Sequence, residues 1–357
     1  MTLEHRSHRE IVGVALQTAG NLGTPTDPCT HLIPVSAFNA QEVYEQILDS
    51  GRRGPDSKDF RAVQGVKHVE ISLEGLVQMN GTTGAPIGML LRSILGCGAA
   101  GANGPYWSPI QVGGTGVYKH YRYLGTTQEY LTVQHNNRNT AANFREFEGC
   151  RVTELTFTWN AGEGLLGYSA TLIGRDFTKQ TDTMADLSAQ DVTLEDPFPG
   201  WRAAVVFNGS SNARLISAEW TLSRGSSRVY TGQNVQQFAA LYFEPLEVTV
   251  ALVFDYEDDT ELDLFKAGTQ VEITNLFEYG SSGTLRGFGL SMETASLLEA
   301  PAVVDSSGVQ MTLALSARGL YSTTAGEIAT DKSDQGTVDS QSGPIETFTE
   351  ERQVAGY

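Results

Sequence analysis

The first regular pattern along the chain is an alternation of apolar and polar residues over positions 66–76 (VKHVEISLEGL). A period of two predicts a half-buried strand, with one face against a core and the other in water. Residues 87–95 then carry apolar residues at helical spacing and stop at Gly96, which predicts a short helix. The apolar strand face is Val69, Ile71 and Leu73, the polar face is Glu70, Ser72 and Glu74, and the helical stripe is Ile87, Leu90, Leu91, Ile94 and Leu95.

The second half of the chain repeats this order. Residues 246–254 alternate in the same way, and a helical turn over 261–266 follows and ends at 267–268. Each half then has a strand–turn–strand pattern, over 152–173 with a stop at 174–175 and over 285–316 with a stop at 317–318. Strand, helix and long hairpin in the same order predict two copies of one small β-rich fold.

Composition adds the domain boundaries. A chain of 357 residues is long enough for two or three domains. The polar stretch 179–200 ends in the turn-forming sequence DPFPG and predicts a linker between the copies. We therefore predict modules at 1–185 and 186–329. Residues 330–357 are rich in Asp, Glu, Ser, Thr and Gln, which predicts an acidic C-terminal arm that is disordered alone and ordered by a neighbour.

Charge is unevenly distributed between the halves. Residues 1–185 carry 15 Lys and Arg against 17 Asp and Glu, whereas residues 186–357 carry 9 against 25, which together give the net charge of −18. Such an acidic chain is not expected to grip nucleic acid, because phosphate binding depends on Lys and Arg releasing counterions. An acidic surface would suit DNA only where contact must stay weak.

Targeting signals and cysteine chemistry are not indicated. The first residues lack the apolar core of a secretory signal, and no apolar run approaches the ~18 residues that a membrane span needs. We expect a chain made in the cytoplasm without membrane insertion. Cys29, Cys97 and Cys150 are odd in number and have no C-x-x-C spacing, which predicts free thiols and no structural zinc.

Catalytic motifs do not survive inspection either. Residues 96–101 match G-x-G-x-x-G, but these glycines follow a helix, whereas a dinucleotide fingerprint opens one. The acidic run 255–263 lacks the spacing of a calcium loop and favours capping of the helix that follows, with Thr260-x-x-Asp263 as a capping box. Glu70 and Glu74 lie roughly 13 Å apart by strand rise, too far for glycosidase chemistry. We expect no enzymatic activity, no cofactor and no metal.

Two loops remain without a role from these patterns. Residues 48–65 form a long charged connection between strands, and such loops usually move or bind. Residues 96–125 are rich in glycine and aromatic residues.

The hairpin at 149–176 resembles one in the tail tube (major tail) proteins of long-tailed, non-contractile bacteriophages. The matching residues are GCRVTELT at 149–156, a turn at 161–164, and an apolar strand ending in GRD at 174–176. Residues 11–25 (IVGVALQTAGNLGTP) are similar to the opening of that family, and residues 246–268, ending in LFKAGT, resemble the same block in a second copy. The resemblance covers most of residues 8–320. The 98–125 insertion and the acidic tail depart from it.

This resemblance implies a mostly β fold of two tandem β-sandwich or β-barrel modules, each with a short flanking helix, that contribute strands to a ring-shaped β-barrel. The implied function is a structural virion protein of the phage tail, whose rings stack into a tube that conducts DNA into the host. A two-module chain is expected to form a homotrimeric ring with pseudo-six-fold symmetry, although a homohexamer stays open. Implied partners are further copies of the chain, the tape measure protein, the tail-tip and terminator proteins, and genomic DNA in transit without specific binding.

Three groups of residues receive predicted roles in that assembly. The charged loop at 51–61 is expected to contact the next ring, the wet faces of the two matched strands are expected to face the lumen, and the arm is expected to cross a neighbouring subunit. In the same order these residues are Arg52, Arg53, Asp56, Lys58, Asp59 and Arg61; Glu70, Glu74 and Glu247; and Asp331, Asp334, Asp339, Glu346, Glu350 and Glu351.

Other functions remain open at the level of sequence. A carbohydrate-binding or carbohydrate-active β-sandwich protein would use the Trp and Tyr residues of 98–130 as a sugar platform. A ring protein of the tail tip or baseplate is a further alternative.

Overall fold

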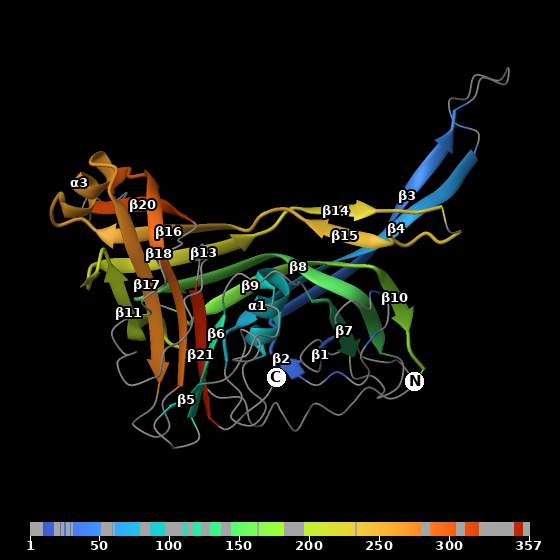
Figure 1. The fold of residues 1–357 in the computed structure, drawn as a ribbon, viewed down its shortest axis with the longest axis horizontal. Coiled ribbons are helices and arrows are strands. Elements are labelled where there is room, and N and C mark those ends of the chain that lie inside the picture. Colours follow the sequence, from blue (N-terminus) through green and yellow to red (C-terminus); the bar gives the residue numbers. More distant parts are fainter. Residues whose placement is uncertain are drawn as a thin grey trace, which may run out of the picture.

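A computed structural model describes residues 10–17, 22, 25, 29, 31–50, 59, 61–78, 86–96, 110–112, 117–122, 129–136, 144–162, 164–181, 196–232, 234–279, 286–304, 311–320 and 346–352. The described chain is mostly β, with two α-helices (Figure 1). Its elements are β1 (Ile11–Leu16), β2 (His31–Ile33), β3 (Ala37–Asp49), β4 (Arg61–Leu76), α1 (Ile87–Leu95), β5 (Ile110–Val112), β6 (Val117–Arg122), β7 (Leu131–Asn136), β8 (Arg145–Asn160), β9 (Gly167–Gly174), β10 (Asp176–Lys179), the 3₁₀ turn η2 (Gly200–Arg202), β11 (Ala203–Phe207), β12 (Ser210–Ser211), β13 (Leu215–Ser223), β14 (Ser226–Val229), β15 (Ala240–Phe243), β16 (Glu247–Asp255), α3 (Thr260–Lys266), β17 (Gln270–Tyr279), β18 (Arg286–Glu299), β19 (Ala302–Val304), β20 (Met311–Gly319) and β21 (Glu346–Arg352).

One antiparallel sheet runs through both halves of the chain. Its central strands follow the order β3, β4, β9, β8, β13, β16, β20, β18. β8 and β13 join the halves, because residues 154–160 pair with residues 217–223. Burial alternates along these strands, with apolar residues on one face and polar residues on the other. The sheet thus places a continuous core on one side and a continuous polar face on the other.

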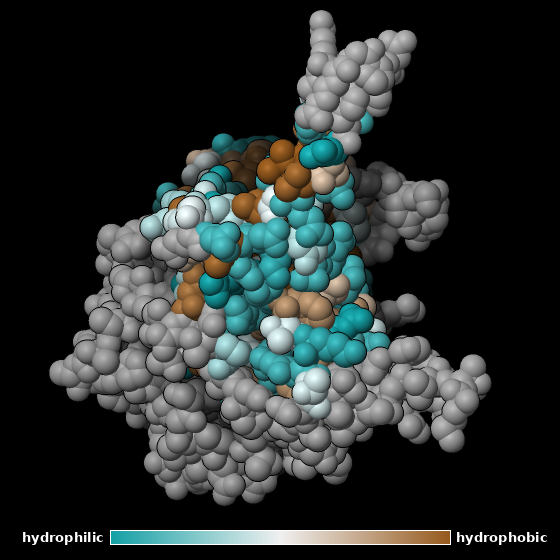
Figure 2. Space-filling view, turned by 90° about the vertical axis from the view of Figure 1, so that its right-hand side faces the viewer, coloured by the Kyte–Doolittle hydropathy of each residue, from teal (hydrophilic) through white to brown (hydrophobic). Residues whose placement is uncertain are grey.

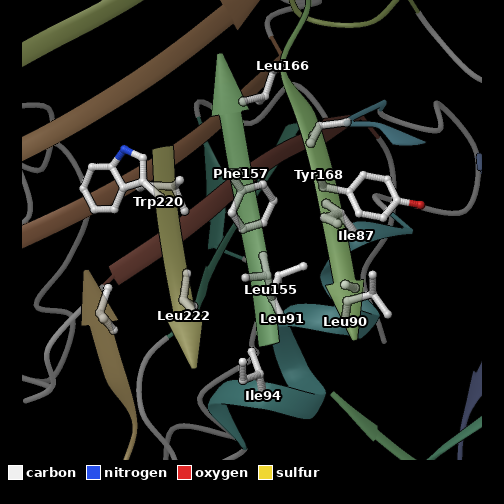
Figure 3. Close-up of a cluster of buried hydrophobic side chains, with 14 of the residues drawn as sticks. Ile87, Leu90, Leu91, Ile94, Leu155, Phe157, Leu166, Tyr168, Trp220 and Leu222 are labelled. Atoms are coloured by element: carbon white, nitrogen blue, oxygen red, sulfur yellow. The ribbon is translucent and has the colours of Figure 1, made fainter. Parts of the chain in front are cut away.

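The core is built around α1 and the junction between the halves. Leu155 and Phe157 of β8 stand opposite Leu222 and Trp220 of β13. Figure 3 shows these side chains gathered with the apolar stripe of α1. The helix ends at Gly96, whose φ of 86° favours glycine, and the Gly96 N–H bonds to the carbonyl of Arg92. The labelled helix residues of this cluster are Ile87, Leu90, Leu91 and Ile94.

The two halves pair their strands in the same pattern. In the first half the neighbours are β2–β1–β7–β8–β9–β4–β3, and in the second they are β12–β11–β17–β18–β20–β16–β13. In both halves a helix comes directly after one of the matched strands along the chain. In the first half α1 follows β4, and in the second half α3 follows β16. Each half thus contains six antiparallel pairings in the same order, and the division into two copies of one module stays a prediction.

Most predicted elements are confirmed, and some are longer or additional. The strand at 66–76, the helices at 87–95 and 261–266, and the hairpin at 152–173 are present as predicted. The second predicted hairpin differs, because β18 and β20 pair only through residues 295–299 and 316–319, β19 lies between them, and β20 continues past the predicted stop to Gly319. β4 starts at Arg61, so part of the predicted charged loop is strand, and β3 and β4 form one long hairpin. The short strands β5, β6 and β21 were not predicted. Within the described chain the sheet does not close into a barrel, and most of the predicted linker lies outside the described residues.

Candidate assembly surface

The junction between the halves is a fully bonded strand pair. The Arg224 N–H bonds to the Thr153 carbonyl at 2.8 Å, and the Ala161 N–H bonds to the Ile216 carbonyl at 2.8 Å. These two hydrogen bonds, one at each end of the strand pair, show which residues of β13 direct their backbone N–H and C=O groups toward β8. The side-chain hydroxyls of Thr156 and Thr221 lie 3.4 Å apart on the polar face. The halves are therefore joined by main-chain hydrogen bonds, as neighbouring strands of one domain are.

The Arg224 side chain connects this junction to α1 by a hydrogen bond. Its Nη1 donates to the carbonyl of Ile94 at 2.9 Å, in the last turn of α1, and its Nε donates to the carbonyl of Glu244 at 3.2 Å. A cation there meets the negative end of the helix dipole. Burial lowers the pKa of Arg224 and lowers the pKa of nearby Arg151 to about 10. The Arg151 guanidinium stacks on the Tyr130 ring, with 3.8 Å from its Cζ to the centroid.

The polar face of the sheet carries the three predicted lumen residues. Glu70 and Glu74 lie on β4 and Glu247 on β16, and all three are exposed and point away from the core. Glu70 contacts His68 at 3.2 Å, and Glu247 pairs with Arg318 at 3.3 Å. The sheet thus brings the three carboxylates to one face, which sequence alone did not establish. Exposed or half-exposed neighbours on this face are Asn39, Gln41, Ser72, Glu154, Thr156, Thr158, Ser169, Thr171, Glu219, Thr221 and Thr249.

The β3–β4 hairpin projects from the rest of the molecule (Figure 1). Ile47, Leu48 and Val63 on its shaft have 57%, 52% and 59% of their surface exposed. Figure 2 shows apolar surface near the outer end of the described hairpin. Of the predicted loop residues, Asp59 and Arg61 are described, and Arg61 pairs with Asp49 at the start of β4. Arg52, Arg53, Asp56 and Lys58 lie outside the described residues.

A second hairpin, β14–β15, lies across the first half of the chain. Asp176 accepts hydrogen bonds from the side chains of Lys67 and Gln237. Arg175 donates to the carbonyl of Phe238 at 3.2 Å and pairs with Glu148 at 3.1 Å. Burial alone would lower the pKa of Lys67, but the bond and charge of Asp176 raise it. We call Lys67, Asp176, Arg175 and their partners on 236–238 the clasp.

The clasp gives Arg175 and Asp176 a role that the sequence did not reveal. Both belong to the GRD stretch that ends the predicted hairpin, where they served only as part of the stop at 174–175 and of the family resemblance. Their partners on the second hairpin lie about 60 positions away in the sequence, and Lys67 lies 109 positions from Asp176, so no local pattern connects them. Phe238, whose carbonyl takes part, is fully buried.

Part of the acidic tail pairs with its own chain. β21 carries Glu346, Glu350 and Glu351 and lies between β18 and β6. The prediction of disorder therefore does not hold for this segment, because two strand edges are available to order it. Asp331, Asp334 and Asp339 lie outside the described residues. The predicted contact of the arm with a neighbouring subunit stays a prediction.

Comparison with known protein families identifies this architecture. The family described as phage tail tube protein matches residues 8–317. The chain belongs to the phage tail tube protein family. A search of curated proteins found no match.

As a phage tail tube family protein, the chain is a structural component of a phage tail. This favours the first of the predicted functions over a carbohydrate-active one, and it suggests a protein without enzymatic activity. Within the described residues no group of His, Cys, Asp and Glu is arranged to hold a metal ion. No helix in that part of the chain is long and apolar enough to cross a membrane.

The acidic run of this tail tube protein has a structural explanation. Arg214 pairs with Asp258 at 3.1 Å and with Glu261, which is buried. The carboxylate of Asp258 also accepts the backbone N–H of Thr260 at 2.9 Å. Hydrogen bonds from the Thr260 side chain and backbone N–H, together with Arg214, hold the pKa of Asp258 down to about 2. The N-cap position is Asp259, whose side chain makes no capping hydrogen bond, and Asp258 one residue earlier accepts the first helical N–H instead. The predicted box with Thr260 as N-cap is wrong, because Thr260 is already the first residue of α3.

Proposed function

We propose that this protein assembles into rings that stack to form the tail tube, the conduit through which phage DNA reaches the host. The observation that supports this most directly is the repeated strand pattern. Each half offers the same four central strands, and the two sets join edge to edge through β8 and β13. Further copies joined in the same way would extend the sheet until it closed into a ring, which leaves no strand edge exposed.

The two halves act as tandem modules in this proposal, so three chains supply six similar positions around one channel. The polar face with Glu70, Glu74 and Glu247 lines the lumen. Carboxylates and hydroxyls there repel or only weakly contact phosphate, so DNA slides without being held. The tape measure protein would fill the same lumen before DNA does, and tail-tip and terminator proteins would meet the end rings.

The charged loop at 51–61 would link one ring to the next. Its mixed charges suit pairing with a copy of itself or with another charged surface. Reversing Arg52 and Arg53 to Glu is expected to leave rings intact and to stop stacking, which sedimentation and microscopy would detect. The acidic arm would strengthen contacts between subunits, so deletion of residues 331–357 is expected to weaken assembly.

Electron microscopy of the purified protein, together with the mass of the smallest assembled species, tests the proposal. We expect rings or hollow tubes and a ring mass of three chains. A protein that stays monomeric at high concentration would contradict the assembly, and a ring of six chains would contradict the tandem use of the halves.

A further inference from the structure

The junction between the two halves contains enough detail to define the contact between two copies. It consists of a strand pair, residues 154–160 against 217–223, and of a hairpin, residues 226–243, that crosses the neighbouring half. If the halves are equivalent, each of these parts has a counterpart elsewhere in the same chain.

The counterpart of β8 is the end of β18 together with β19. Both strands contain an irregularity at the same place relative to their partners. In β8 the register shifts between Val152 and Glu154, opposite Leu172 and Thr171 of β9. In β18 it shifts between Leu297 and Glu299, opposite Ala317 and Ser316 of β20. Glu154 therefore corresponds to Glu299, and since β19 continues the same register, residues 154–159 correspond to residues 299–304.

The counterpart of β13 is β3. Leu172 of β9 stands opposite Ile71, and Ala317 of β20 stands opposite Val250, so Ile71 and Val250 correspond. Ala40 in turn stands opposite Ile71, and Trp220 stands opposite Val250. Residues 37–43 therefore correspond to residues 217–223.

Within the described residues both counterparts are edge strands. Among the described strands, β3 pairs only with β4, and β19 pairs only with β20. In the junction, bonded pairs such as 153–224 and 161–216 require that alternate residues of β13, Trp220 among them, turn their backbone toward β8. Ala40 accordingly turns its N–H and C=O to the open edge of β3. Pro301 does not obstruct the other edge, because its carbonyl accepts from Ala314 and its backbone faces β20.

We propose that β3 of one copy pairs antiparallel with residues 299–304 of a second copy, with Val43 opposite Glu299, Gln41 opposite Pro301, and Asn39 opposite Val303. This inference rests on the proposed self-assembly and adds to it the two edges and their register. The partner of each of these two edge strands is a second copy of this chain.

The hairpins β14–β15 and β3–β4 also occupy corresponding positions in the two halves. The pair Arg228–Leu241 of β14–β15 corresponds to the pair Leu48–Ala62 of β3–β4. Leu241 is buried, whereas Leu48 is 52% exposed. In the assembly the Leu48 side of β3–β4 lies across the second half of the next copy, near residues 244–246, which correspond to residues 65–67 at and beside the clasp residue Lys67. The opposite side, with Ile47 and Val63, stays available for contact between rings.

Disulfide trapping tests the register. In the assembly Gln41 and Pro301 form a non-hydrogen-bonded pair, for which Cα atoms lie about 4.5 Å apart, within the range of a disulfide. We would combine Gln41→Cys with Pro301→Cys and oxidise the assembled protein. Thr156→Cys with Thr221→Cys is the matched control within one chain, because those hydroxyls lie 3.4 Å apart in the equivalent pair. Ala37→Cys with Pro301→Cys is the register control, displaced by roughly 13 Å along the strand.

The expected result is a covalent dimer and higher species for the 41–301 pair on a non-reducing gel, at least tenfold above the 37–301 pair and the unsubstituted chain. The 156–221 pair should close within one chain, without a change in oligomer mass. Asn39→Cys with Val303→Cys provides a second pair in the same register should the first variant fail to fold. Tubes without covalent oligomers from either pair would overturn the register and leave the proposed function standing. An unsubstituted chain that forms no rings would overturn both.

Discussion

The two hairpins of this protein share a fold but differ in what they touch. The hairpin of the second half, residues 226–243, lies on the first half, where Phe238 and Leu241 are buried and the clasp holds its loop. The hairpin of the first half, β3–β4, has the same pairing but projects, with Ile47, Leu48 and Val63 more than half exposed. Exposed apolar groups on a projecting element usually mark an interaction surface.

The difference follows from position along the chain. The second half has the first half beside it, so its hairpin finds a surface within the same molecule. The first half has no further half on its β3 side, so its hairpin finds one only in another copy. The comparison therefore separates residues that stabilise the single chain from residues reserved for assembly, and substitutions at corresponding positions should separate these two effects.

The largest effect on the single chain is expected for Trp220→Ala. Trp220 is fully buried at the junction of the halves, and its Nε1 donates to Asn275 Oδ1 at 3.1 Å. Removing a buried Trp costs about 3–5 kcal/mol of unfolding free energy through the lost contacts and the cavity that remains. Urea unfolding measures this loss. A change below about 1 kcal/mol would mean that the junction is not part of the folded core.

Asp176→Asn should have the next largest effect. Asp176 is the acceptor for both Lys67 and Gln237, and its side chain is only 16% exposed. Loss of the charge leaves Lys67 without its main partner, and this lowers the free energy of unfolding by about 1–3 kcal/mol. Amide hydrogen exchange should rise in residues 226–243 and stay unchanged in β16.

Asp263→Asn is the matched control for the clasp. The Asp263 carboxylate lies 3.5 Å from the Lys266 ammonium, and both side chains are more than half exposed. Exposed ion pairs of this kind contribute little to the free energy of unfolding. Equal destabilisation by the two substitutions would argue against the clasp as the anchor of the second hairpin.

Ala40→Pro should leave the single chain almost intact and prevent ring formation. The Ala40 N–H faces the edge of β3 that has no partner among the described strands, so proline removes no bond of the described sheet but places its ring where a second copy would pair. We expect a change in unfolding free energy of about 1 kcal/mol or less. Gln41→Pro is the control, because its N–H faces β4 and its loss should destabilise the chain itself. Normal tubes from Ala40→Pro would exclude β3 as an assembly edge.

The sequence predicted elements well where one face of the chain is buried and poorly elsewhere. The helix at 87–95 was placed correctly because its apolar stripe is unbroken and Gly96 takes a positive φ. The shaft residues 61–65 were assigned to a loop because both sides of that segment are exposed, so no alternation marks the strand. The join between β8 and β13 and the clasp connect residues some 60 positions apart, and only the folded chain brings them together.

The smallest effect on the single chain is expected on the polar face. Glu70→Lys and Glu74→Lys change exposed side chains on a sheet face without core contacts, so the unfolding free energy should shift by no more than about 0.5 kcal/mol. In assembled tubes the same substitutions turn the proposed lumen toward positive charge, and DNA should then be retained in a salt-dependent way. Binding of short duplexes to tubes at low and high salt measures this. Asp263→Lys is the control, since Asp263 lies on α3 and away from the face that carries Glu70, Glu74 and Glu247. Retention by the Asp263 variant at the level of the double variant would show that net charge alone is responsible, and would remove the support for this face as the lining of the channel.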